Sequence, residues 1–154
     1  METHIKPTSQ SLREYGQYQR GFMLMVFCVS GIYWSLARYM DAPVFNQDQY
    51  GWFIMSVTAE TWLAPLFFAS GAHLVAQVIN GDPRLPSLAT PLVRMASAVV
   101  VAADLLLFAF GGLFAPYFDL YFAYTGAVGF VSLWFAWLGF GDVKRGLQVT
   151  RGAL

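Results

Sequence analysis

The sequence predicts an all-α integral membrane protein whose four transmembrane helices form one bundle. Hydrophobic residues make up 57% of the 154 residues. Charged residues make up only 12%, whereas soluble domains carry about 25%. Four apolar stretches have the length of about 20 residues that a helix needs to span a bilayer. We therefore expect a single membrane domain over residues 1–154, with no room for a second one.

The basic residues predict how this domain is oriented. Short cytoplasmic loops retain Lys and Arg, and if the four spans alternate in direction, all basic residues except Arg38 fall beside the ends of spans on one side. They are Lys6, Arg13, Arg20, Arg84, Arg94, Lys144, Arg145 and Arg151. The expected topology places both termini in the cytoplasm.

The first span is expected over 21–40, after a cytoplasmic tail over 1–20. Ser11 and Glu14 have the spacing of a capping box, which predicts that a short helix begins there. This short helix either lies along the inner membrane surface, as an interfacial helix, or leads straight into the first span.

The second span is expected over 51–78 and contains Pro65, which cannot donate a backbone hydrogen bond and predicts a kink. Turn-forming residues over 80–86 end this span on the cytoplasmic side. The third span is expected over 89–114, and a short outer turn follows it.

The fourth span is expected over 120–140 and is followed by a cytoplasmic tail over 141–154. Small and polar residues recur along it at steps of four and three, which places them on one helix face. They are Thr125, Gly129, Ser132, Ala136 and Gly139. Small side chains let helix backbones approach closely in lipid, so we expect this face to pack against another helix.

Glu60 and Asp104 are the ionisable residues predicted to lie deep inside the spans. They lie about nine and ten residues from the outer ends of their spans, which at 1.5 Å per residue puts both at a depth of about 14 Å. Such residues usually face the bundle interior. We expect an intramembrane polar site of Glu60 and Asp104, with Arg38 within reach. The pair either locks two helices together, moves protons or cations, or contacts a partner or cofactor.

Other chemistry finds no support in the sequence. No phosphate-binding glycine loop and no nucleophile elbow occurs, so neither nucleotide binding nor an enzyme activity is expected. His73 and Cys28 are too isolated to form a metal or haem site within one chain, so no metal and no cofactor are expected. The net charge of zero gives no electrostatic footprint for nucleic acid.

These observations favour a small non-catalytic protein that acts as a structural or accessory subunit of a membrane complex, or as a homo-oligomer. Its expected partners are the lipid bilayer and other membrane subunits or copies of itself. A proton- or cation-conducting channel or transporter that uses Glu60 and Asp104 is the alternative, and a holin-like pore former of viral origin is a second one. The expected location is the bacterial cytoplasmic membrane, or the inner membrane of a host if the chain is virus-encoded.

Overall fold

A computed structural model describes the backbone of residues 9–39, 59–80, 88–112 and 120–152, and most of the side chains within these ranges. The described residues form four α-helices: α1 (Ser9–Tyr39), α3 (Ala59–Val78), α4 (Ala89–Gly112) and α5 (Leu120–Gly152). This part of the chain has no strand, and the predicted all-α class is confirmed for it.

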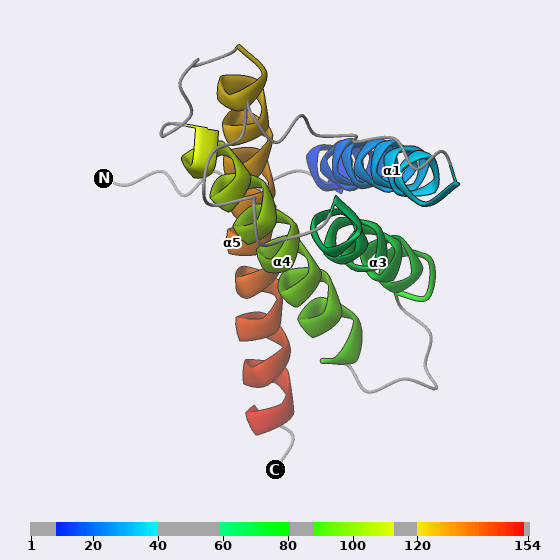
Figure 1. Cartoon of the computed structure of the whole chain (residues 1–154). Helices are drawn as coiled ribbons and strands as arrows, with labels where there is room; N and C mark the ends of the chain where they lie inside the picture. The colour runs from blue at the N-terminus through cyan, green and yellow to red at the C-terminus, as the bar shows by residue number, and fades with distance from the viewer. Residues whose placement is uncertain (1–8, 40–58, 81–87, 113–119, 153–154) are drawn as a thin grey trace.

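The helices are arranged so that α3 and α4 join two outer helices (Figure 1). α1 packs against α3, α3 packs against α4, and α4 packs against α5. The start of α1 and the end of α5 lie at the same end of the bundle, because Gln19 and Asp142 both contact Arg94 near the start of α4. We call this the polar end, and the other the distal end.

Two helices are longer than the sequence predicted. α1 runs through residues 9–39 without a break, so the prediction of a separate interfacial helix is corrected, and the helix leads straight into the segment expected as the first span. The segment contains glycine but no proline, and nothing in it stops the run of helical hydrogen bonds. α5 continues past the expected end of the fourth span at 140 to Gly152.

The other boundaries follow the turn residues. α4 covers 89–112 of the expected third span, whereas 113–114 lie outside the described residues. α3 covers 59–78 of the second span and keeps Pro65 inside one helix, whereas 51–58 lie outside the described residues. The expected outer loops lie outside them too.

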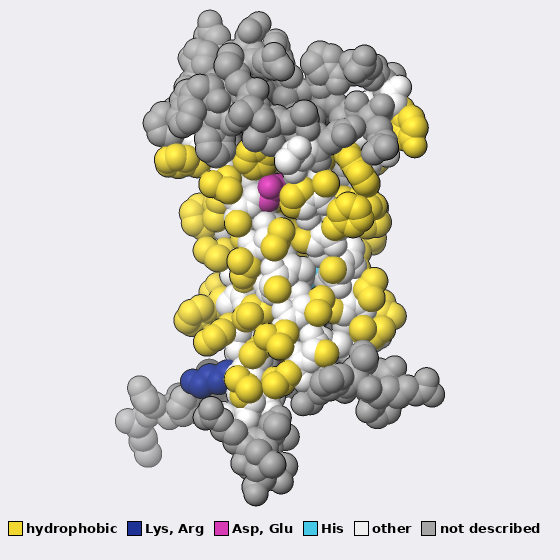
Figure 2. Space-filling view, turned by 60° about the horizontal axis from the view of Figure 1, so that its bottom comes forward, with side chains coloured by type: hydrophobic (Ala, Val, Ile, Leu, Met, Phe, Trp, Pro, Cys, Tyr) yellow, Lys and Arg dark blue, Asp and Glu magenta, His cyan; other side chains and the backbone are white. Residues whose placement is uncertain are grey.

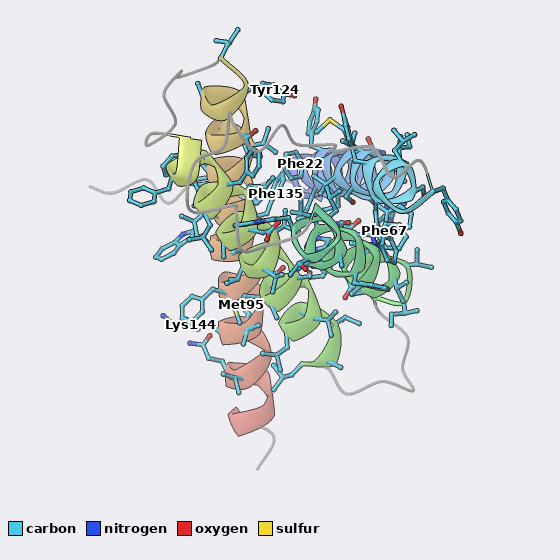
Figure 3. All side chains as sticks on the ribbon, in the orientation of Figure 1. Phe22, Phe67, Met95, Tyr124, Phe135 and Lys144 are labelled. Carbon is cyan, nitrogen blue, oxygen red and sulfur yellow. The ribbon has the colours of Figure 1, made fainter. Side chains whose placement is uncertain are left out.

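α1 and α3 pack through two aromatic rings that each cover a glycine of the opposite helix. A Cβ atom at Gly31 would lie 2.9 Å from Cε2 of Phe67, and a Cβ atom at Gly71 would lie 3.1 Å from Cε2 of Phe27. The rings of Phe27 and Phe67 stack with centroids 4.5 Å apart. Figure 3 shows Phe67 between the two helices. We call this arrangement the aromatic interlock.

α4 and α5 pack through a line of glycines, which we call the glycine seam. A Cβ atom at Gly139 would lie 3.1 Å from the Cα atom of Met95, so the backbones themselves are close. A Cβ atom at Gly129 would lie 2.9 Å from Cγ of Leu106. Close backbone contact of this kind maximises van der Waals packing, which is the main attraction between helices in lipid.

All four helices contribute to the centre of the bundle. Met23, Ala98, Phe135 and Ala136 form a buried cluster, and Leu74 of α3 packs against it. The rings of Phe22 and Phe135 meet edge to face, with centroids 5.2 Å apart, and join α1 to α5 (Figure 3). The cluster holds the two helix pairs together midway along the bundle.

Three of the buried serines bond within their own helices. The hydroxyl groups of Ser30, Ser70 and Ser132 each donate to a carbonyl group four residues earlier in their own helix. A hydroxyl group satisfied in this way is buried without the cost of an unpaired donor.

Large apolar side chains cover the outside of the bundle between its two ends (Figure 2). α4 over Ala89–Gly111 and α5 over Ala123–Gln148 are long and apolar enough to cross a membrane. Only 28% and 33% of their most apolar windows are buried inside the molecule. Soluble monomers rarely expose apolar surfaces of this extent.

Candidate functional site: a polar cluster at one end of the bundle

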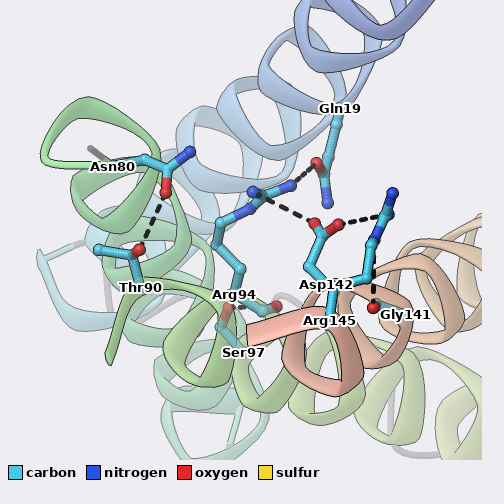
Figure 4. Close-up of polar contacts among 8 residues, drawn as sticks. All are labelled: Gln19, Asn80, Thr90, Arg94, Ser97, Gly141, Asp142 and Arg145. Atoms are coloured by element: carbon cyan, nitrogen blue, oxygen red, sulfur yellow. Dashed lines mark hydrogen bonds and ion pairs between the residues drawn. The ribbon is translucent and has the colours of Figure 1, made fainter. Parts of the chain in front are cut away.

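Arg94 is the centre of a group of polar side chains at the polar end (Figure 4). Its Nη2 atom donates a hydrogen bond of 2.7 Å to Oε1 of Gln19 on α1. Its Nη1 atom lies 3.7 Å from Oδ2 of Asp142 on α5. The Arg94 side chain is only 16% exposed, so one largely buried guanidinium group of α4 contacts α1 and α5 together.

Asp142 has a second cationic partner. Nη2 of Arg145 donates to Oδ1 of Asp142 at 2.8 Å, and the Arg145 side chain is 69% exposed. Exposed ion pairs contribute about 0–1 kcal/mol, so the Arg145 contact adds little stability. Two guanidinium groups against one carboxylate leave a positive charge at this end.

On the distal side of Arg94, His73 of α3 and Ser97 of α4 form a buried hydrogen-bond chain. Nδ1 of His73 lies 2.9 Å from Oγ of Ser97, and this Oγ donates to the backbone oxygen of Arg94 at 3.0 Å. The one hydroxyl hydrogen is used there, so Ser97 accepts a hydrogen bond and the His73 proton is assigned to Nδ1. Nε2 of His73 is then a buried acceptor with no protein partner among the described residues.

A third contact joins α3 to α4 near the surface. Oγ1 of Thr90 donates to Oδ1 of Asn80 at 2.9 Å. Asn80 follows α3 and Thr90 lies in the first turn of α4, so the bond links the two ends of 81–87. Together, the contacts of the cluster hold all four helices at the polar end.

Asp104 lies far from this cluster, in the distal half of α4. It is half-buried and borders a cavity of about 50 Å³ together with Leu63, Leu66 and Phe108, so the walls beside it are largely apolar. Among the described side chains it makes no ion pair. Figure 2 shows acidic surface within the apolar belt, toward the opposite end from the basic patch that is visible in this view.

The other two residues of the predicted intramembrane site are placed by their backbone alone. Glu60 lies in α3, three residues before Leu63, and Arg38 lies next to the last residue of α1. Their side chains lie outside the described residues. Residues of both α3 and α4 line the cavity beside Asp104, and one of them, Leu63, lies about one helical turn from Glu60.

The five residues of the predicted packing face on α5 are all buried: Thr125, Gly129, Ser132, Ala136 and Gly139. Gly129 and Gly139 belong to the glycine seam against α4. This face therefore lies in the interior of the bundle.

Sequence reasoning missed the polar cluster. It assigned Arg94 and Arg145 to topology alone and gave Gln19 and Asp142 no role. One signal was available, because Arg94 is the single basic residue a full turn inside the third span. Its partner Gln19 is 75 positions away, and only the fold brings the two together.

The described residues contain no group of three or more His, Cys, Asp or Glu side chains that could hold a metal ion. The arrangement of the cluster instead suits the binding of negative charge. Comparison of the chain with protein-family models, with curated proteins and with solved structures finds no significant match.

Proposed function

We propose that this chain is a small non-catalytic integral membrane protein that spans the bilayer four times and acts as a structural or accessory subunit of a membrane complex, or as a homo-oligomer. The observation that carries the proposal is the belt of exposed apolar side chains between the two ends of the bundle (Figure 2). A surface of this kind is stable against lipid or against other apolar helices.

The belt also includes α1 and α3, which are not among the helices found long and apolar enough to cross a membrane. α1 contributes Leu24, Val29 and Ile32, and α3 contributes Phe68 and Val75, all of them exposed. These side chains lie at the same levels as the apolar surfaces of α4 and α5. Four spans therefore account for the surface better than two.

The charges at the polar end support the cytoplasmic position of both termini. Arg20, Arg94, Lys144 and Arg145 all belong to this end, where α1 begins and α5 ends. Basic residues at the ends of spans are retained in the cytoplasm.

An open groove supports assembly with a neighbour. It has a volume of about 650 Å³ and lies mainly along α1, where Cys28, Gly31 and Ser35 occupy successive turns beside larger apolar side chains. Cys28 and Ser35 are exposed. Small residues on an exposed face let a further transmembrane helix approach closely.

Extraction of membranes with alkaline carbonate tests the membrane location, because an integral protein stays in the pellet. Cross-linking tests assembly. Cys28 is the only cysteine of the chain, so a bis-maleimide should join two copies through the groove, or join this chain to a stoichiometric partner that has a cysteine beside the groove.

Two further cysteine positions sharpen the cross-linking test. In a Cys28→Ala background, Ser35→Cys should cross-link in the same way, whereas Val99→Cys, on the exposed face of α4, should not. A protein that is not cross-linked at either groove position, and that purifies from its native membrane as a monomer without a partner, contradicts the subunit proposal.

A conducting role for Glu60 and Asp104 is the second candidate, and the cavity beside Asp104 favours it. It comes second because Ala98, Val101 and Phe135 fill the interior between Asp104 and the polar end. Proton or cation flux into liposomes that falls in Glu60→Gln and Asp104→Asn variants, while the amount of folded protein is unchanged, would favour it over the subunit role.

A further inference from the structure

A second feature of the polar end is a hollow of about 310 Å³ between α1, α3 and α4. The polar side chains that line it are Gln17, Gln19, Arg20, Gln77, Asn80 and Arg94. Two are cationic and none is acidic. Among the described residues, the carboxylate that contacts Arg94 belongs to Asp142, which does not line the hollow.

Two donors and one acceptor in the walls have no partner among the described residues. Nε of Arg94 and the side-chain amide nitrogen and oxygen of Gln77 are buried and make no hydrogen bond to the protein. Arg20 lines the hollow, is exposed, and makes no ion pair within the described part of the chain. Buried polar groups in native proteins are almost always satisfied. A ligand in this hollow would meet unused donors and an excess of positive charge.

We propose that this hollow binds the phosphate group of an anionic ligand, either a phospholipid headgroup or free phosphate. Guanidinium groups donate from a fixed planar fork that matches phosphate oxygens, and neutral amides add directed hydrogen bonds. The lipid form of the proposal rests on the membrane location proposed above, and the free-phosphate form does not.

The position of the hollow fits a headgroup. Arg20 lies where the polar part of α1 meets its apolar part, and the exposed side chain of Leu24 follows one turn further along. A phosphate group held at Arg20 would place acyl chains beside this apolar surface. Basic pockets between helices on the cytoplasmic side are typical headgroup sites.

The test uses the full chain in a neutral maltoside detergent and two probes. Native mass spectrometry follows the retention of phosphatidylglycerol, with phosphatidylcholine for comparison, and calorimetry follows inorganic phosphate. We expect one phosphatidylglycerol molecule per chain and weaker retention of phosphatidylcholine. Arg20→Gln should weaken binding at least about tenfold, because a charge-assisted hydrogen bond is lost.

Lys144→Gln is the matched control, because Lys144 is an exposed basic residue of the same end that does not line the hollow and makes no ion pair within the described part of the chain. It should leave binding unchanged within about a factor of two, because salt and water screen an exposed charge that does not contact the ligand. Gln77→Leu keeps the charge and removes the amide group, and it should also weaken binding. Melting temperatures show whether each variant is folded.

If phosphatidylglycerol binding is lost in Arg20→Gln but not in the control variant, the hollow is a headgroup site. If binding of inorganic phosphate is lost in Arg20→Gln but not in the control variant, and phosphatidylglycerol is not preferred to phosphatidylcholine, the hollow is a site for free phosphate. The proposal is overturned if neither probe binds, or if Arg20→Gln and Lys144→Gln weaken binding equally. A chain released by alkaline carbonate would disprove the membrane location. Calorimetry with inorganic phosphate would still test whether the hollow binds phosphate.

Discussion

The two helix pairs of this molecule are held by opposite means. In the glycine seam, α4 and α5 bring backbone against backbone, and the Cα atom of Met95 faces Gly139. In the aromatic interlock, α1 and α3 stay further apart and the rings of Phe27 and Phe67 fill the space. A backbone cannot move away from an added methyl group, whereas a ring can turn about its side-chain bonds. The seam should therefore tolerate substitution poorly and the interlock better.

The largest effect is expected where the two pairs are tied together. Arg94→Gln removes a largely buried guanidinium group that contacts both Gln19 and Asp142. Loss of this group should reduce the free energy of unfolding by about 2–3 kcal/mol, because it leaves the buried amide oxygen of Gln19 without its donor and removes the contact with Asp142. Equilibrium unfolding in mixed detergent micelles, followed by tryptophan fluorescence, measures it.

Arg145→Gln should cost under about 0.5 kcal/mol in the same assay, because the Arg145 side chain is 69% exposed. Equal losses for the two arginine variants would show that Arg94 acts only as surface charge and does not join the helix pairs.

The seam should respond next. A methyl group at Gly139 would lie 3.1 Å from both Cα and Cβ of Met95, so Gly139→Ala forces α4 and α5 apart. We expect a loss of about 2 kcal/mol from overpacking. Gly141 lies two residues further along the same helix, and a methyl group added there would meet no atom of a neighbouring helix within 4 Å. Gly141→Ala should stabilise by about 0.5–1 kcal/mol through helix propensity. If both variants behave alike in thermal melts, the close approach at Gly139 has no energetic consequence.

The two helix pairs can be compared most directly at two glycines where an added Cβ atom would meet its nearest neighbour at the same distance. An added Cβ atom would lie 2.9 Å from Leu106 at Gly129 and 2.9 Å from Phe67 at Gly31. At Gly129 the atom that is met is Cγ, near the helix, whereas at Gly31 it is Cε2 at the far side of a ring. Gly129→Ala should lose about 1 kcal/mol, and Gly31→Ala should be close to neutral as helix propensity offsets a small ring movement. A greater loss for Gly31→Ala than for Gly129→Ala would reverse the comparison.

A small effect is expected at the link between Asn80 and Thr90. Thr90→Val removes the hydroxyl group that donates to Asn80 and keeps the shape of the side chain. Asn80 is exposed and water can replace the lost donor, so the loss should be about 0.5 kcal/mol. Hydrogen exchange at the ends of α3 and α4 should rise while exchange at the centre of the bundle stays the same.

The helices themselves could be predicted from the sequence because their signals are local. Apolar runs and turn residues placed α3 and α4, and the absence of a stop signal before residue 21 explains why α1 begins far earlier than the apolar run. α5 continues beyond Phe140 because helical hydrogen bonding does not require apolar side chains, so hydropathy underestimates the length of such a helix.

The candidate site could be predicted only in part. The spacing of Gly129 and Gly139 indicated a packing face, because both lie on one helix. The contact of Arg94 with Gln19 joins helices that are distant in the sequence, and it depends on how α1 and α4 are set against each other. Periodicity within a helix contains no information about this arrangement.

The aromatic interlock also has an evolutionary consequence. Each ring covers the glycine of the facing helix, so the chain contains two coupled pairs of positions, 31 with 67 and 27 with 71. In homologous chains, a side chain larger than glycine at position 31 should occur with a residue smaller than phenylalanine at position 67, and position 71 should depend on position 27 in the same way. Paired substitutions of this kind would record the contact between α1 and α3 in the family's own sequences.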